Sequence, residues 1–176
     1  MSEINKVIYQ VGTSADGFIA RVDGGIDWLT GFDPNNYGFD SFMKGVGAVV
    51  VGANTYRQML AMGEWPYQMP TYVATRQQSN FPAAPGVHFV NGNPKHFMAE
   101  IRTATDGTVF LLGGAQLAGS CFRAGAVDEI VITALPLLIG SGIPLSRDTG
   151  RDVNLVLTGL QNFDDGVVQS TYKVEM

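Results

Sequence analysis

The sequence predicts a single α/β domain over residues 1–176, a three-layer sandwich with a mostly parallel central sheet, helices on both faces and a C-terminal antiparallel hairpin. Two observations predict this fold. As far as Ala124, strand-like runs alternate with helix-like segments, which is typical of right-handed crossovers in a parallel sheet. Beyond Ala126, strand-like runs follow one another without a convincing helix between them, which is typical of antiparallel pairing.

The strands of the first part are predicted from short runs of β-branched and aromatic residues. They cover residues 7–11, 46–51, 71–74, 87–90 and 108–112. Each run is typical of a buried strand. The 22 glycines form no repeat and stand at the ends of such apolar runs, where turns are expected.

Four helices are expected between these strands. They cover residues 34–44, 54–62, 94–105 and 115–124. In the first of them, Asp33 is a suitable N-cap and Pro34 occupies the first helical position. Phe39, Phe42 and Met43 give this helix an apolar face at i, i+3 and i+4 spacing.

Three further strands are expected after Ala126, at residues 129–135, 154–160 and 167–174, and we expect them to join the sheet as antiparallel edge strands. Asp164, Asp165 and Gly166 are a turn signal that joins the last two strands into a hairpin. Residues 136–144 contain two glycines and two prolines and are expected to form a structured loop. No shift in composition marks a domain boundary.

Composition and charge exclude several classes of function. The chain is 45% hydrophobic and 15% charged, enough for a full core. Its net charge is −5 and its Lys and Arg residues are scattered, so no nucleic-acid partner is expected. No apolar run approaches the roughly 18 to 20 residues of a membrane span, and no secretory signal is visible, which predicts a cytoplasmic protein. Cys121 is the single cysteine, so no internal disulfide is expected, and with only His88 and His96 beside it no Cys/His metal site is expected.

The strand at 108–112 runs into Gly113 and Gly114 and then into a helix that begins with Ala115, Gln116 and Leu117. Such a junction points free backbone N–H groups, and the positive end of the helix dipole, at the carboxyl edge of the sheet. This is a suitable site for a pyrophosphate. A tight turn that needs positive φ and has no ligand explains a lone Gly-Gly pair equally well.

Two more strand ends carry polar groups at the same edge. After the strand at 46–51, Asn54 or Thr55 can bond a phosphate or simply cap the helix. After the strand at 71–74, Thr75 and Arg76 place a hydroxyl and a guanidinium there. Because open α/β sheets bind ligands outside the carboxyl ends of their strands, three such ends together favour a nucleotide cofactor.

A glycine-rich segment follows the first strand. It contains an Asp-Gly pair in residues 14–20 and Trp28 in residues 24–29, and it can close over a ligand and exclude water. The alternative is an Asp-Gly turn with Trp28 filling a hole in the core.

Five motifs occur in the same order as in a known superfamily. They are Ser-x-Asp-Gly-x-Ile (14–19), Gly-x-x-Thr-Tyr (52–56), Tyr-Val-x-Thr-Arg (72–76), Gly-Gly-Ala-x-Leu (113–117) and Pro-Leu-Leu-Ile-Gly-Ser-Gly-Ile-Pro-Leu (136–145). Together they span nearly the whole chain and resemble the dihydrofolate-reductase-like superfamily. Within it, they resemble the branch of the reductase domain of the bifunctional riboflavin-biosynthesis protein.

The resemblance implies an NADPH site whose parts come from separate segments. Backbone groups of two residues would meet the nicotinamide carboxamide, the loop at 16–19 would cover the nicotinamide, two strand-to-helix junctions would hold the pyrophosphate, and a Thr-Arg pair would lie by the adenosine 2′-phosphate. The implied cofactor-binding residues are Val11, Gly12, Asp16, Gly17, Ile19, Gly52, Ala53, Asn54, Thr55, Thr75, Arg76, Gly113, Gly114, Ala115, Gln116 and Leu117. Ala53 departs from the pattern, because dihydrofolate reductases usually have a basic residue there.

The resemblance also implies a reductase that transfers hydride from NADPH to a C=N or C=O bond of a pterin, pyrimidine or related heterocycle. It would be similar to 5-amino-6-(5-phosphoribosylamino)uracil reductase or to dihydrofolate reductase. On the substrate side, Trp28 and the helix at 34–44 would line the site, Asp40 or an ordered water would supply the proton, and Thr133 matches a threonine that supports the substrate-binding carboxylate in the folate enzymes. No basic cluster for a ribose phosphate is visible there.

Two further expectations concern turnover and assembly. The lack of an unambiguous proton donor leaves open a nucleotide- or small-ligand-binding protein of the same fold without turnover. The strands after Ala126, with the resemblance, predict a homodimer that covers an exposed sheet edge near the C-terminus.

Overall fold

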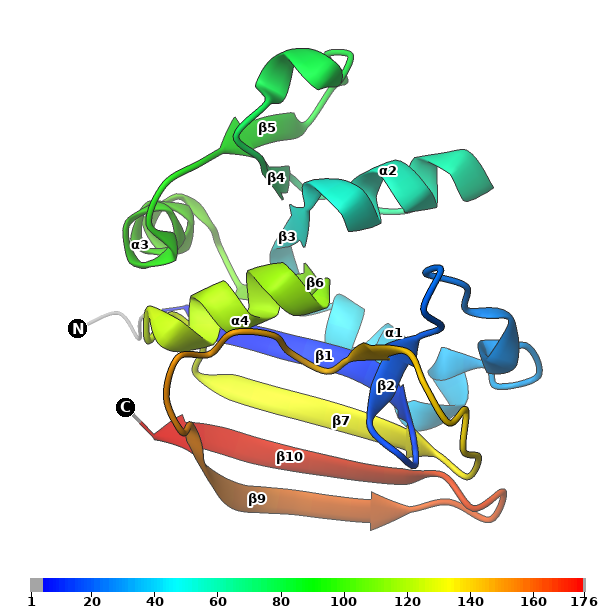
Figure 1. Ribbon diagram of the computed structural model, residues 1–176. Helices are drawn as coiled ribbons and strands as arrows, with labels where there is room; N and C mark the ends of the chain where they lie inside the picture. The colour runs from blue at the N-terminus through cyan, green and yellow to red at the C-terminus, as the bar shows by residue number, and fades with distance from the viewer. Residues whose placement is uncertain (1–4, 176) are drawn as a thin grey trace.

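The computed structural model describes residues 5–175 and confirms the predicted α/β architecture (Figure 1). Its main sheet has eight strands in the order β5–β4–β3–β6–β1–β7–β10–β9. In chain order these are β1 (Val7–Ser14), β3 (Val46–Gly52), β4 (Thr71–Ala74), β5 (Val87–Val90), β6 (Thr108–Gly113), β7 (Glu129–Leu135), β9 (Asn154–Asn162) and β10 (Val168–Glu175). Every neighbouring pair from β5 to β7 is parallel, whereas β10 and β9 form the expected antiparallel hairpin.

Helices cover both faces of the sheet (Figure 1). α3 (Pro94–Ala104) and α4 (Ala115–Arg123) pack on one face against a core that includes Tyr9 and Leu111. α1 (Phe39–Met43) and α2 (Ala53–Met62) lie on the other face, where aromatic rings of α1 pack on Phe110. Full burial of one such large apolar side chain contributes about 1.5 to 3 kcal/mol, so the alternation of faces along these strands stabilises all three layers.

The helix predicted at residues 34–44 is interrupted. The chain forms a 3₁₀ turn, η2 (Pro34–Tyr37), and then α1, with Gly38 between them at φ 81°. The predicted N-cap is confirmed, since Asp33 Oδ1 accepts a 3.0 Å hydrogen bond from the Asn35 N–H. A left-handed residue cannot continue a right-handed helix, so Gly38 divides the segment.

The strand at 129–135 has the predicted bounds, but the prediction that it pairs as an antiparallel edge strand is wrong. β7 pairs parallel with β1 in a register from Ile8↔Glu129 to Ser14↔Leu135. The reason is that α4 works as a crossover between β6 and β7, which returns the chain to the starting edge of the sheet before β7 begins. The antiparallel pairs at this side of the sheet are β7–β10 and β10–β9.

A small second sheet lies beside the carboxyl ends of the parallel strands. It pairs β2 (Phe18–Ala20) with β8 (Ile143–Pro144), and neither strand was expected from the sequence. This pairing gives the loop predicted at 136–144 its structure and fastens it to the glycine-rich segment after β1. Within the described residues 5–175, no helix is long and apolar enough to cross a membrane.

Candidate functional site

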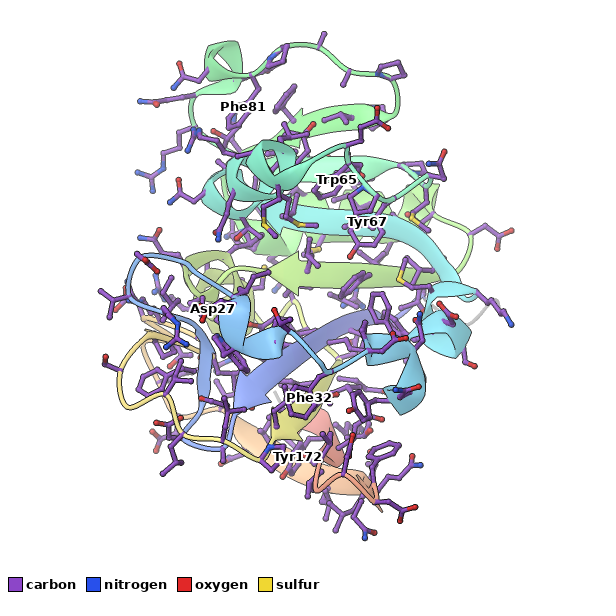
Figure 2. The ribbon with its side chains drawn as sticks, turned by 90° about the vertical axis from the view of Figure 1, so that its right-hand side faces the viewer. Asp27, Phe32, Trp65, Tyr67, Phe81 and Tyr172 are labelled. Carbon is purple, nitrogen blue, oxygen red and sulfur yellow. The ribbon has the colours of Figure 1, made fainter. Side chains whose placement is uncertain are left out.

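A cleft of about 1120 Å³ lies at the carboxyl edge of the parallel strands. Its walls come from the ends of β1, β3, β4 and β6, from α2 and the start of α4, and from the segment that follows β2. Figure 2 shows this segment, with Asp27 and Phe32, on the same side of the molecule as Trp65 and Tyr67 of the loop after α2. The position agrees with the general rule for ligand sites in open α/β sheets.

The cleft brings together most of the residues that the motifs indicated. Those that line it are Val11, Gly12, Ile19, Gly52, Ala53, Asn54, Thr55, Thr75, Arg76, Gly114, Ala115, Gln116 and Leu117. Three others, Asp16, Gly17 and Gly113, do not line it. Gly113 lies beneath the surface, where a Cβ would meet the Tyr9 ring at 3.4 Å.

The strongest anion-binding feature is a pair of helix N-termini that face the cleft side by side. α2 begins after Gly52 and α4 begins after Gly114, and neither start is capped by a side chain. The alternative that Asn54 caps α2 is therefore wrong; its Oδ1 accepts a hydrogen bond from Arg57 instead. Uncapped N–H groups at two adjacent helix starts are free to donate hydrogen bonds to an anion.

Little space is left where the two junctions meet. A Cβ on Gly114 would lie 3.0 Å from Thr55 Oγ1, and one on Gly52 would lie 3.6 Å from the Gly113 carbonyl oxygen. Larger residues here would fill the space between the two helix starts. Gly113 has φ 107°, as the turn interpretation requires, so the turn and the ligand-binding interpretation of the Gly-Gly pair both stand.

Two arginines line this part of the cleft. Arg76 follows β4, as predicted. Arg147 was missed; its backbone N–H donates to the Ala115 carbonyl oxygen at 3.0 Å, which holds it beside the start of α4. The sequence did carry a signal, because Gly119 lies in the middle of α4 and a helical glycine often marks the close approach of another backbone. A Cβ on Gly119 would lie 1.5 Å from the Arg147 carbonyl oxygen.

The loop after β1 is fastened to the segment before β8. Asp16 accepts hydrogen bonds from the backbone N–H groups of Gly140, at 2.8 Å, and Ile139, at 3.2 Å. Its pKa is lowered, first by a hydrogen bond with the Ser14 side chain and then by these two N–H groups. The Asp16 carboxylate therefore holds the loop and does not line the cleft, and its predicted place at the cofactor stays a prediction. Of the loop residues named from the motif, Ile19 is the one that reaches the cleft.

The other end of the cleft has a different character. Ile26, Leu29, Met59 and Met62 supply apolar surface there. Leu29 lies over the end of β1, because its Cδ2 would be 3.8 Å from a Cβ on Gly12. Sequence reasoning had not assigned these four residues to the site, since they are ordinary apolar residues until α2 and the segment after β2 face each other.

Two amides and one carboxylate accompany this apolar surface. Gln10 projects from β1, Glu64 follows α2, and Gln58 Nε2 donates to the Gly24 carbonyl oxygen. This last contact joins α2 to the segment after β2 across the cleft. The end of the cleft is therefore polar but carries little charge.

The predicted catalytic residues lie elsewhere. Asp40 is exposed in the first turn of α1, where the helix N-terminus stabilises a carboxylate. It lines neither this cleft nor the smaller cavity beside it. Trp28 is only 6% exposed and packs with Tyr37, Leu135 and Val167. Among the described residues, neither Asp40 nor Trp28 lines the cleft, and the buried Nε1 of Trp28 has no hydrogen-bond partner, so the substrate-side roles of both residues stay predictions.

Thr133 lies on β7, and its partner Gln169 lines a second cavity of about 270 Å³. Its hydroxyl oxygen accepts a 2.8 Å hydrogen bond from Gln169 Nε2, which also donates to the Tyr37 carbonyl oxygen. The partner of Thr133 is thus a carboxamide rather than a carboxylate. Gln10 borders both cavities and separates them.

A family model described as the RibD C-terminal domain matches residues 5–169. The chain belongs to this family. One relative is YwjB of Bacillus subtilis, an uncharacterized protein that is 32% identical over 165 residues, covering 92% of this chain and 94% of YwjB.

Solved structures agree with the RibD C-terminal domain assignment. A protein of Shewanella sp. PV-4, a candidate riboflavin biosynthesis protein, superposes with a TM-score of 0.83 at 27% identity, covering 97% of this chain and 99% of that one. Two more distant structures share the fold. One is a diaminohydroxyphosphoribosylaminopyrimidine deaminase/5-amino-6-(5-phosphoribosylamino)uracil reductase of Thermotoga maritima, with a TM-score of 0.74 at 15% identity, covering 98% of this chain and 57% of that one. The other is a dihydrofolate reductase of Enterococcus faecalis complexed with NADP(H), with a TM-score of 0.71 at 17% identity, covering 97% of each chain.

Proposed function

We propose that this RibD C-terminal domain is an NADPH-dependent reductase that transfers hydride to a C=N or C=O bond of a pterin, pyrimidine or related heterocycle. One observation carries the proposal. A single continuous cleft combines an anion-binding part, formed by two uncapped helix N-termini and two arginines, with a largely apolar part whose one charged group is the exposed Glu64. A dinucleotide with a charged pyrophosphate and a neutral nicotinamide fits this division.

The residues of the cleft fit NADPH segment by segment. The starts of α2 and α4 would hold the pyrophosphate, and Arg76 would bond the adenosine 2′-phosphate. Arg147 would supply positive charge near the pyrophosphate and so compensate for Ala53, which has no charge. When bound, the nicotinamide supplies the hydride. Ile19 and Leu29 would shield the reacting atoms from water.

The proton has a separate source in this proposal. Among the described residues that line the cleft, Glu64 is the one carboxylate, and it is exposed beyond the end of α2. The inner wall carries Gln10, whose amide cannot act as an acid. Water would therefore deliver the proton, while Gln10 orients the substrate through hydrogen bonds.

A second candidate is a nucleotide- or small-ligand-binding protein of the same fold without turnover. The observation in its favour is the same lack of an acid on the inner wall of the cleft. Turnover decides between the two candidates. Loss of the absorbance of reduced nicotinamide in the presence of a panel of pterins and pyrimidines supports the reductase, and tight NADPH binding without oxidation by any of them supports the binding protein.

The cofactor site has its own test. Gly114→Val places a branched side chain against Thr55 Oγ1, between the two helix starts, and is expected to lower NADPH affinity by at least about a hundredfold. Nicotinamide fluorescence measures the affinity. Ala99→Val, at an exposed position of α3, is the matched control and should bind NADPH normally. Unchanged affinity in a folded Gly114→Val protein would place the cofactor elsewhere.

A further inference from the structure

The cleft has two ends, and α2 runs from one to the other. This helix spans ten residues and therefore rises by about 15 Å from its start to its end. Its N-terminus belongs to the anion-binding part, so Met59, Met62 and Glu64 lie at the opposite end. If the protein is a reductase as proposed above, that end is where the part of the substrate remote from the reacting bond lies.

We infer that the substrate carries no phosphate or other anionic group, and that an uncharged, largely apolar substituent of the heterocycle lies against Met59 and Met62. This inference rests on the proposed function and names the substrate class for the same cleft. Three features of the described residues carry it: the charge at this end, the engagement of the nearby arginines and the chemistry of the wall.

The charge at this end of the cleft is negative. α2 ends here, and the carbonyl groups of its last turn give a helix C-terminus a partial negative charge. Glu64 follows two residues later and adds an exposed carboxylate to the wall. A phosphate ester at this end would meet both, and like charges repel.

The arginines close to this region are held by other partners. Arg57 of α2 donates to Asn54 Oδ1 at 3.1 Å and stacks over the Phe81 ring, 5.0 Å from its centroid. In Figure 2, Phe81 lies on the far side of Trp65 from the segment that carries Asp27. Arg21 forms a two-point salt bridge with Asp27 at 2.6 and 2.8 Å. Neither arginine lines the cleft.

The arginines that do line the cleft lie at its other end. Among the described lining residues, Arg76 follows β4 and Arg147 lies beside the start of α4, where the cofactor phosphates would bind. A substrate phosphate at this end, where Met62 is 64% exposed, would therefore have no cation to pair with.

The chemistry of the wall suits a neutral substituent. Met59 and Met62 offer polarizable thioethers, which adapt to flat or irregular apolar groups. Gln10 can both donate and accept hydrogen bonds, so it can meet a ring edge that presents an amide or an amine. These groups bind an uncharged heterocycle without the help of a cation.

The experiment compares two matched pairs of ligands. They are 5-amino-6-(ribosylamino)uracil and its 5′-phosphate, and 6-hydroxymethyl-7,8-dihydropterin and its phosphate monoester. Calorimetry measures the affinity of each, both for the protein alone and for the protein saturated with NADPH. In at least one pair, we expect the neutral member to bind about tenfold or more tightly than its phosphate.

Variants test whether charge at this end causes the preference. Glu64→Lys should reduce the preference for the neutral member by about tenfold, and Glu64→Gln by a smaller factor. Glu100→Lys, an exposed residue of α3 that does not line the cleft, makes the same change in net charge and should leave the preference unchanged.

The outcomes separate this inference from the proposed function. Failure to bind or oxidise NADPH refutes the reductase, whatever the ligand pairs show. Equal or tighter binding of the phosphorylated member in both pairs overturns the inference about the substrate, even in a protein that uses NADPH. So does the absence of binding by both neutral ligands.

Discussion

Gly119→Ala is a substitution whose sign distinguishes helix propensity from packing. Gly119 lies within α4, where alanine is favoured over glycine by about 1 kcal/mol, so propensity alone predicts a more stable protein. In the structure, however, a Cβ at this position would lie 1.5 Å from the Arg147 carbonyl oxygen and 2.6 Å from its carbonyl carbon. The obstacle is backbone, so the whole segment must move away from α4.

The cost follows from the hydrogen bonds that this movement breaks. The Arg147 N–H donates to the Ala115 carbonyl oxygen at 3.0 Å, and the Tyr9 hydroxyl donates to the Leu145 carbonyl oxygen at 2.8 Å. Losing the first costs about 1 kcal/mol, and leaving the fully buried Tyr9 hydroxyl unpaired costs about 1 to 3 kcal/mol. After subtraction of the propensity gain, the free energy of unfolding should fall by roughly 1 to 3 kcal/mol.

Urea unfolding followed by circular dichroism measures this change, and nicotinamide fluorescence measures NADPH affinity in the same variant. Affinity should fall as well, because Arg147 moves away from the start of α4. Ala99→Gly, at an exposed position of α3, is the control for helix propensity and should cost about 1 kcal/mol without any effect on NADPH. A Gly119→Ala protein as stable as the wild type or more stable would show that the segment does not pack on α4 in this way.

Three other predictions concern the cofactor, the loop and the assembly. Arg76→Ala should remove a roughly tenfold to hundredfold preference for NADPH over NADH, and salt should weaken that preference in the wild type. Dissociation constants of both cofactors across a salt series measure the preference. A preference that survives the substitution would contradict the role of Arg76. The pKa of Asp16 is lowered in the folded protein, so the contacts of its carboxylate persist above its ordinary pKa and are lost as pH falls through the lowered value. Amide exchange at Gly140 should rise at that low pH, and in Asp16→Asn it should be raised at every pH. Unchanged exchange would argue against the contact. We propose a homodimer through β9, an edge strand on which Leu157 and Leu160 are 51% and 68% exposed; light scattering should give twice the chain mass, Leu160→Glu should give monomers, and a monomeric wild type would exclude the dimer.

Local patterns in the sequence predicted the parts of the site that depend on single segments. The strand that ends at Gly113 and the helix that follows it could be recognised because their patterns are short and continuous. The same holds for the strand before Gly52 and for the Asp33 N-cap. Once the sheet was taken as parallel, the strand ends had to meet at one edge, and the cleft lies there.

Local patterns could not predict the direction of a side chain that depends on distant partners. Asp40 belongs to a segment that Gly38 divides, and the resulting short helix leaves the carboxylate exposed. The role of Asp16 depends on backbone N–H groups more than 120 residues away, at Ile139 and Gly140. Neither environment can be read from neighbours in the chain.

By itself, the sequence determined the α/β class, the positions of the strands of the main sheet and the two glycine junctions, because backbone propensity and the spacing of apolar residues act over a few neighbouring residues. Only the tertiary structure decided the parallel direction of β7, the approach of Arg147 to α4 and the weakly charged, slightly negative character of the cleft beyond Met62. These features are set by which surfaces meet when the layers pack. That choice is made by the summed burial and hydrogen bonding of segments far apart in the chain, so no single window of sequence contains it.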